Sequence, residues 1–113
     1  MSTVSEIAKV CHEVNRAYCA ATGDVRAAPW AYATVAQRES MRRGVEFALE
    51  HPAATPADQH AVWLADKIAA GWRYGSLRSE AIKEHPCILP YDQLPQAQRV
   101  KDSLFQAIVK AMT

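Results

Sequence analysis

The stretch that decides the fold is His60–Asp92, which reads HAVWLADKIAAGWRYGSLRSEAIKEHPCILPYD. It begins as a helical segment, passes through an aromatic turn at Gly71–Gly75 and ends in a proline-punctuated segment at His85–Asp92. Glycine favours the end of a helix, and a residue before proline avoids helical backbone. On both sides of this stretch the chain has the pattern of amphipathic helix. We therefore expect His60–Asp92 to supply most of any functional site.

The helix that enters this stretch has a clear start. Thr55 is placed to cap it, Pro56 suits the first helical position, and Asp58 puts a negative charge in the first turn. Its apolar residues recur every three or four positions, which predicts one buried face. That predicted face consists of Ala61, Leu64, Ala65, Ile68, Ala69 and Trp72.

Trp63 lies off this apolar face. Lys67 follows it by one helical turn, and His60 precedes it by three residues, so all three share one side of the helix. Trp72 is read as a core residue, together with Ile68. Trp63 lies outside the apolar face, so packing in the core does not explain its position as it explains that of Trp72.

Beyond the aromatic turn, Ser79–Glu84 has the pattern of a short helix capped by Ser79. Pro86 and Pro90 then predict an extended strap that closes the bundle, with Leu89 as part of the same architecture. Pro95 is expected at the first position of the last helix. The apolar face of that helix consists of Ala97, Val100, Leu104, Ala107, Ile108, Ala111 and Met112.

The first half of the chain predicts two further helical regions. The first helix is capped by Ser2 or Ser5 and stops at Gly23, and its apolar face consists of Ile7, Val10, Cys11, Val14, Ala17, Tyr18 and Ala21. The second region runs from Trp30 to His51–Pro52 and has a polar middle. We expect either a break or bend between Thr34 and Ser40, or one long helix with a solvated face.

These segments predict an all-α fold. It is a small bundle of four main helices plus one short helix, with a proline-rich strap before the last helix. A length of 113 residues, half of them hydrophobic and 22% charged, fits a single domain over residues 1–113. The helix pairs Ser5–Pro52 and Thr55–Met112 have comparable lengths, which would suit a pseudo-twofold bundle, but their residue matches are too few to assert one.

Composition excludes several classes of protein. A formal net charge of +1 does not favour nucleic-acid binding, and the basic cluster at Arg38, Arg42 and Arg43 is read as a solvated helix face. Three cysteines without a CxxC spacing argue against a disulfide framework and a zinc site, and they are read as small buried hydrophobic residues. The start of the chain does not resemble a signal peptide, and no apolar run suits a membrane span. We expect a cytoplasmic protein without metal or cofactor.

No catalytic constellation is evident. His85 and Cys87 could share one face of an extended segment, but the prolines around them indicate a packed strap. The acidic residues are scattered, the histidines have no metal-ligand spacing, and a phosphate loop is absent. We therefore expect a protein that is not an enzyme. Binding of a small planar ligand or of a protein remains, because Trp63 lies beside Lys67, and Tyr74 lies near Arg73 and Arg78.

Several rare residues in order carry a resemblance to a known family. The segments are HAVWLADKIAAGWRYG from His60, KEHPCILPYDQLP at Lys83–Pro95 and KDSLF at Lys101–Phe105. Together they resemble the RyR domain, first described as a repeat in the cytoplasmic part of ryanodine receptors. The similarity is dense over residues 55–112 and looser before them.

The resemblance implies an all-α domain of two helical halves that senses nucleotide-derived signals. In the receptors, the tryptophan of the H-x-x-W motif is thought to stack on an adenine-type ligand, and Trp63 matches it. Tyr74 and Tyr91 match the tyrosines of the aromatic turn and of the strap. Ion conduction does not carry over. Whether Trp63 faces Trp30, the first helix or a second subunit stays open.

The resulting hypothesis is a non-catalytic module that binds a nucleotide or a nucleotide-derived signal in an aromatic-lined pocket. Trp63 would stack on the base, the cations would meet phosphate or ribose oxygens, and the remaining residues would shape the edge. The predicted ligand-binding residues are His60, Trp63, Lys67, Arg73, Tyr74, Arg78 and Tyr91. The alternative is a structural or protein-interaction module, such as a homodimer, with the aromatic residues in a core or an interface.

Overall fold

The computed structural model describes residues 2–113 of the chain, and it is built mainly of helices. The helices are α1 (Val4–Ala21), α2 (Val35–Glu50), α3 (Pro56–Ala69) and α4 (Gln96–Ala111), with two 3₁₀ turns, η1 (Trp30–Tyr32) and η2 (Tyr91–Gln93). Two short strands, β1 (Arg73–Tyr74) and β2 (Glu84–His85), lie between α3 and α4. The predicted all-α bundle of four main helices is confirmed.

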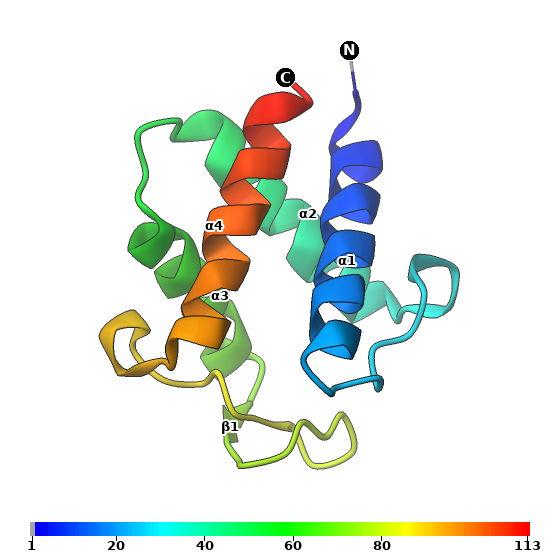
Figure 1. Ribbon diagram of the computed structural model, residues 1–113, viewed down its shortest axis with the longest axis vertical. Coiled ribbons are helices and arrows are strands. Elements are labelled where there is room, and N and C mark those ends of the chain that lie inside the picture. Colours follow the sequence, from blue (N-terminus) through cyan, green and yellow to red (C-terminus); the bar gives the residue numbers. More distant parts are fainter. Residues whose placement is uncertain (1) are drawn as a thin grey trace.

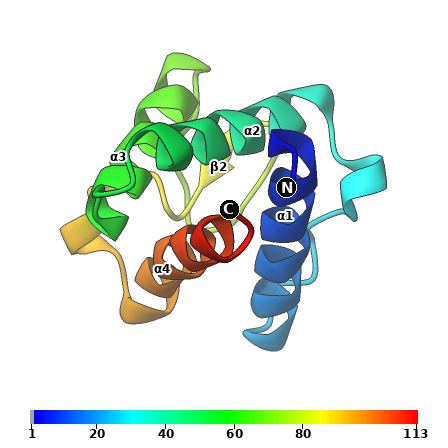
Figure 2. The same ribbon diagram turned by 90° about the horizontal axis from the view of Figure 1, so that it is seen from above.

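The four helices close into a ring. Each packs on the next along the chain, and α4 packs on α1, so that the view down the bundle shows them around a common centre (Figure 2). The paired strands lie at one end of this bundle, beneath α3 (Figure 1). The hydrophobic core lies toward the other end, where α1 begins and α4 ends.

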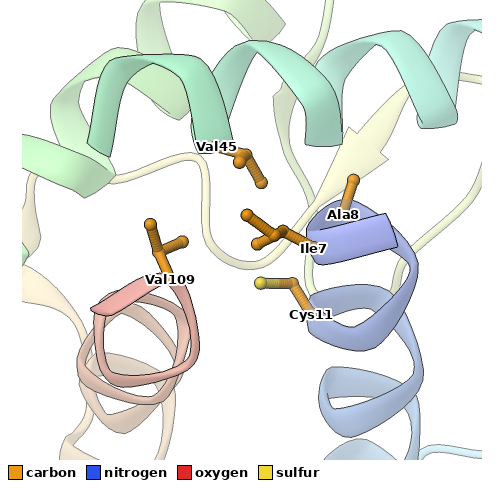
Figure 3. Close-up of a cluster of buried hydrophobic side chains, with 5 residues drawn as sticks. All are labelled: Ile7, Ala8, Cys11, Val45 and Val109. Atoms are coloured by element: carbon orange, nitrogen blue, oxygen red, sulfur yellow. The ribbon is translucent and has the colours of Figure 1, made fainter. Parts of the chain in front are cut away.

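The core is formed by small and branched side chains from three helices. Ile7, Ala8 and Cys11 of α1 meet Val45 of α2 and Val109 of α4, as Figure 3 shows. Ile7 and Val45 are completely buried. Burial of this kind is the main term that stabilises a small bundle. Cys11 therefore packs as a small hydrophobic residue, as its position on the apolar face of α1 predicts.

Helix starts are set by local capping. The expectation that Ser2 or Ser5 caps α1 is wrong, because Thr3 accepts from the Glu6 backbone while the Glu6 side chain accepts from Thr3. Only this spacing places a carboxylate three residues after the cap, which satisfies two free N–H groups together. The cap predicted at Thr55 of α3 is confirmed, again as a reciprocal pair.

The second helical region is divided. After η1, Ala33 is extended and Thr34 caps α2, so the expected break occurs at Thr34 and the alternative of one long helix is wrong. Thr34 and Gln37 form the same reciprocal cap as at the starts of α1 and α3. From Val35 onward α2 continues without interruption to Glu50.

The aromatic turn leaves α3 through a Schellman motif. Gly71 has a φ of +91°, the N–H of Trp72 donates to the Lys67 carbonyl, and the N–H of Gly71 donates to Ile68. β1 then pairs in parallel with β2, and a side chain at Gly75 would place its Cβ 2.6 Å from the Cβ of Glu84. Glycine is required there because the two segments approach so closely.

The short helix predicted at Ser79–Glu84 is wrong. Ser79 and Glu84 exchange two backbone hydrogen bonds in an isolated bridge, and Lys83, directly before Glu84, has a φ of +52°. The N–H of Arg73 also donates to the Lys83 carbonyl, so pairing between distant segments overrides the local helical pattern. This pairing is what carries His85 into the bundle.

The strap predicted to be extended from His85 to Asp92 is extended only in part, because Ile88 donates to the His85 carbonyl across a turn and Tyr91 begins the 3₁₀ turn η2. The strap is attached to both neighbouring helices. His60 of α3 bonds through Nε2 to the Leu89 carbonyl at 2.7 Å, and the Cys87 thiol donates to Gln98 of α4 at 3.1 Å. Pro95 caps α4 and does not occupy its first helical position as expected; the helix begins at Gln96. The strap therefore fixes the spacing between α3 and α4.

The two halves of the chain repeat one local design. In the first half, His12 bonds through Nε2 to the Ala28 carbonyl at 2.6 Å, just before Pro29 and η1. In the second half, His60 bonds to the residue before Pro90, which leads into η2. The backbone angles of the two prolines agree closely, at φ −55° and ψ 152° against φ −56° and ψ 148°. The weak internal similarity of the sequence is thus a structural repeat.

Candidate functional site

A cavity of about 490 Å³ lies between the two halves of the bundle. All four helices contribute to its wall, together with residues of the aromatic turn and the strap. Four of the seven predicted ligand-binding residues line it: His60, Trp63, Lys67 and Arg78. A volume of this size is in the usual range of small-molecule sites.

The face that α3 turns inward differs from the predicted one. Ile68 of the apolar face is 56% exposed, whereas the buried residues of α3 are Gln59 and His60. Both polar side chains are tolerated because each bonds to a backbone carbonyl, Gln59 to Gly44 and His60 to Leu89. Trp63, which the apolar pattern leaves out, is half-buried on this inner side.

His60 has a defined tautomer in its neutral form. A carbonyl oxygen only accepts, so the short contact with Leu89 places the ring hydrogen on Nε2. Nδ1 then presents a lone pair, and it lies 3.7 Å from Oδ2 of Asp102 on α4. Burial raises the pKa of the Asp102 carboxyl to about 7, against an ordinary value of 3.8.

Trp63 is held between two imidazoles. Its ring centroid lies 5.5 Å from that of His60 and 5.2 Å from that of His85, with the second contact edge-on. His85 also contacts Trp72 edge-on at 6.4 Å. The four rings line one side of the cavity.

Lys67 supplies a positive charge at this aromatic wall. Its Nζ lies 5.1 Å from the centroid of the Trp72 ring, a cation–π contact. Burial lowers the pKa of the Lys67 ammonium, and within residues 2–113 it forms no ion pair. Two nearby acids are engaged elsewhere, because Asp66 pairs with Arg43 and Glu80 pairs with Arg78.

The sequence comparison with known families matches residues 39–113 to the RyR domain. The chain belongs to the RyR domain family. The matched region begins inside α2 and includes α3, the paired strands, the strap and α4. It contains all seven predicted ligand-binding residues of this RyR domain.

Three of those residues do not line the cavity. Arg73 is 67% exposed at its side chain and pairs with Glu84 at 3.0 Å, and Tyr74 is 53% exposed. Tyr91 is half-buried, and its ring centroid lies 6.0 Å from that of His60, behind the cavity wall. The geometry thus separates a lining group from a peripheral group.

Helix α1, which precedes the matched region, contributes to the cavity wall together with Trp63 of α3. Asn15 follows His12 by three residues, as Trp63 follows His60, and both line the cavity wall. Trp30 does not line it, because its ring packs against His12 at 5.5 Å and beneath Arg38 at 5.6 Å. In the first half of the chain, Asn15 therefore occupies the position that Trp63 occupies in the second half.

Sequence reasoning missed other lining residues. From the sequence, His85 is considered as a partner for Cys87 and as a possible metal ligand, and no ligand-binding role is assigned to Asn15, Gln59 or Lys101. The HEVN segment from His12 repeats the spacing of HAVW from His60, and this faint match was the signal for Asn15. Nothing in the local pattern marks His85, because the pairing of β2 with β1 places it.

Two buried thiols, Cys11 and Cys87, are held in their protonated form. Burial raises the pKa of Cys11 to about 12, and burial also raises the pKa of Cys87. A thiolate is the form that attacks substrates and binds metals, so both groups are inert at neutral pH. Within residues 2–113, no group of three potential ligands is placed to hold a metal ion.

Among residues 2–113, no helix combines the length and the apolar composition that crossing a bilayer requires.

Proposed function

We propose that this RyR domain is a non-catalytic ligand-binding module that recognises a nucleotide or a nucleotide-derived signal in the cavity beside Trp63. The observation that carries the proposal is the combination of half-buried Trp63 and partly buried Lys67 in the wall of one cavity of about 490 Å³, with no ion pair to Lys67 among residues 2–113. A planar base and a charged group together match these two features.

The aromatic wall supports binding of a planar ring. Stacking of a base on an aromatic side chain contributes roughly 1–3 kcal/mol. Trp63 is the candidate platform, because Trp72 already carries Lys67 over its ring. Asn15 of α1, at the repeat position that corresponds to Trp63, offers a hydrogen-bonding amide in the cavity wall instead of a second aromatic ring.

The charges around the cavity support an anionic ligand. Lys67, Arg78 and Lys101 line it, and the acids closest to Lys67 are partly compensated by ion pairs with arginines. Asp102 is the remaining acid in the wall, and burial favours its neutral form. A phosphate-bearing ligand would therefore meet a net positive wall.

The remaining predicted residues have supporting roles in this proposal. His60 orients the strap and Trp63, and Tyr91 supports His60 from behind. Arg73 and Tyr74 lie outside the lining, so they would touch only a part of the ligand that extends from the cavity.

The test is calorimetry of the whole chain with adenine nucleotides, cyclic nucleotides and ADP-ribose-like compounds. We expect at least one to bind, and Trp63→Ala to weaken it by about tenfold or more, in line with the loss of a stacked base. Tyr32→Ala is the matched control, because Tyr32 is 82% exposed and does not line the cavity. Circular dichroism checks that both variants are folded. No binding across the whole panel contradicts the proposal.

A second candidate function is protein interaction. It is favoured by large exposed hydrophobic side chains between the end of α3 and β2, namely Ile68, Tyr74, Leu77 and Ile82. Light scattering across a concentration series measures whether the chain associates with itself. A dimer that Leu77→Ser dissociates would support this candidate, whereas a monomer at all concentrations argues against self-association.

A further inference from the structure

His85 is held in one tautomer by the strap. The backbone N–H of Cys87 donates to His85 Nδ1 at 2.9 Å. A backbone N–H cannot accept, so Nδ1 carries no hydrogen and the neutral ring has its hydrogen on Nε2. The far side of the ring is therefore an N–H donor.

That donor has no partner among residues 2–113. His85 lines the cavity and contacts both Trp63 and Trp72, and its Nε2 forms no hydrogen bond to the described residues. The N–H group is therefore free to donate to a molecule in the cavity. The partner that fits is an acceptor oxygen.

The neutral state of His85 is stable around neutral pH. Burial lowers its pKa to about 3, and the positive charges of Arg78, Lys101 and Lys67 act in the same direction, opposed only by Asp24. The ring therefore donates one hydrogen bond without adding a charge of its own.

Lys67 stands next to the same indole. Its Nζ lies over the ring of Trp72, which His85 contacts edge-on, so both side chains lie against Trp72 in the wall of the cavity. Lys67 has no anion to neutralise it within residues 2–113. A single anionic group with several oxygens would satisfy both side chains.

We propose that His85 and Lys67 form a phosphoryl-binding subsite at the Trp72 end of the cavity, with His85 as a neutral N–H donor and Lys67 as the charge. This assignment deepens the proposed nucleotide function and rests on it for the base that Trp63 would stack. His85 is thereby a binding residue that fixes where the ligand's phosphate lies relative to its ring.

Two substitutions at His85 separate its role as a hydrogen-bond donor to a ligand from its role as the acceptor for the Cys87 N–H of the strap. In His85→Asn, the side-chain oxygen can still accept from Cys87 while the distal donor is lost. In His85→Gln, the longer amide restores a donor near the position of Nε2. Lys67→Met removes the charge and keeps most of the aliphatic contact with Trp72.

Calorimetry with ADP, adenosine and pyrophosphate distinguishes the sources of binding. We expect His85→Asn and Lys67→Met each to weaken ADP and pyrophosphate by about tenfold, to leave adenosine unchanged, and His85→Gln to recover most of the loss. Equal affinity of ADP for wild type and His85→Asn overturns the subsite and leaves the nucleotide function standing. Binding of pyrophosphate without ADP or adenosine overturns the nucleotide function and leaves the subsite. No binding of any of the three overturns the subsite, and no binding across the full nucleotide panel overturns the nucleotide function as well.

Nitrogen-15 NMR of the imidazoles tests the premise directly. Between about pH 5 and pH 8 the His85 signals should remain those of the neutral Nε2–H form. Added pyrophosphate should shift the Nε2 resonance in wild type and not in Lys67→Met. A hydrogen on Nδ1, or a titration of His85 near pH 6.5, contradicts the proposal.

Discussion

Two ionisable residues of the cavity wall respond to pH in opposite directions. The pKa of His85 is lowered from 6.5 to about 3, and that of Asp102 is raised from 3.8 to about 7, in both cases mainly by burial. The unfolded chain protonates His85 at mildly acidic pH while the folded chain does not, so this residue makes stability rise with pH. Asp102 keeps its proton only in the folded chain, so it makes stability fall as pH rises.

The first prediction follows from this opposition. Between about pH 4 and pH 6.5 the two contributions should largely cancel in the wild type. Relative to wild type, His85→Asn should lose unfolding free energy with rising pH, and Asp102→Asn should gain it, with slopes of up to about 1.4 kcal/mol per pH unit. Urea denaturation at a series of pH values measures both. Parallel profiles for the three proteins would contradict the pKa assignments.

Individual residues also show how far sequence reasoning reaches. Trp63, His60 and Lys67 could be grouped from the sequence because helical spacing puts them on one side of α3. The inward orientation of that side could not be predicted, since Ile68 on the more apolar face is exposed instead. On α3 the usual burial of the more apolar face is reversed, because buried Gln59 and His60 form hydrogen bonds with backbone carbonyls beside the cavity.

At the scale of the elements, helix starts are the best-determined features. The reciprocal caps at Thr3, Thr34 and Thr55 are purely local, since each involves a residue only three positions away. α4 lacks such a cap and begins after Pro95 without a side-chain hydrogen bond. Its position depends on the strap and on packing.

The second prediction concerns these caps. Thr34→Ala should reduce the unfolding free energy by about 1 kcal/mol, because it leaves the Gln37 N–H without its acceptor. Ser103→Ala on the exposed side of α4 is the control and should have little effect. Chemical denaturation of the two variants gives the comparison. A cost at Ser103 equal to that at Thr34 would argue against a capping role.

The segment between α3 and α4 shows where local reasoning ends. Gly71 and Gly75 correctly predict the turn, and Pro86 and Pro90 mark a strap that is extended only in part. The pairing of Arg73–Tyr74 with Glu84–His85 joins residues 11 positions apart in the chain, and it displaces the helix that Ser79–Glu84 would form alone. Such pairing depends on the bundle that supports it.

At the scale of the whole molecule, the cavity belongs to both halves. α1 supplies Ile7, Ala8 and Cys11 to the core, and His12 and Asn15 to the cavity wall. The region that matches the RyR domain, residues 39–113, excludes all of α1. The matched region alone thus lacks one wall of the site.

The third prediction tests this dependence. A fragment of residues 39–113 should lose cooperative unfolding, because Val45 and Val109 would lose the side of the core that Ile7 fills. In the full chain, Ile7→Ala should cost about 2–5 kcal/mol, whereas Val25→Ala, at an exposed position, should cost little. Thermal melts followed by circular dichroism measure both. A fragment that melts like the full chain would show that the halves are independent.

The most direct test of the proposed function is a crystal structure of the full chain soaked with the nucleotide panel. The account predicts a planar ring against the face of Trp63 inside the cavity, with Asn15 across from it and a phosphoryl group near Lys67 and His85. A ring bound elsewhere, such as on Tyr74, or a cavity without ligand after the whole panel, would contradict it.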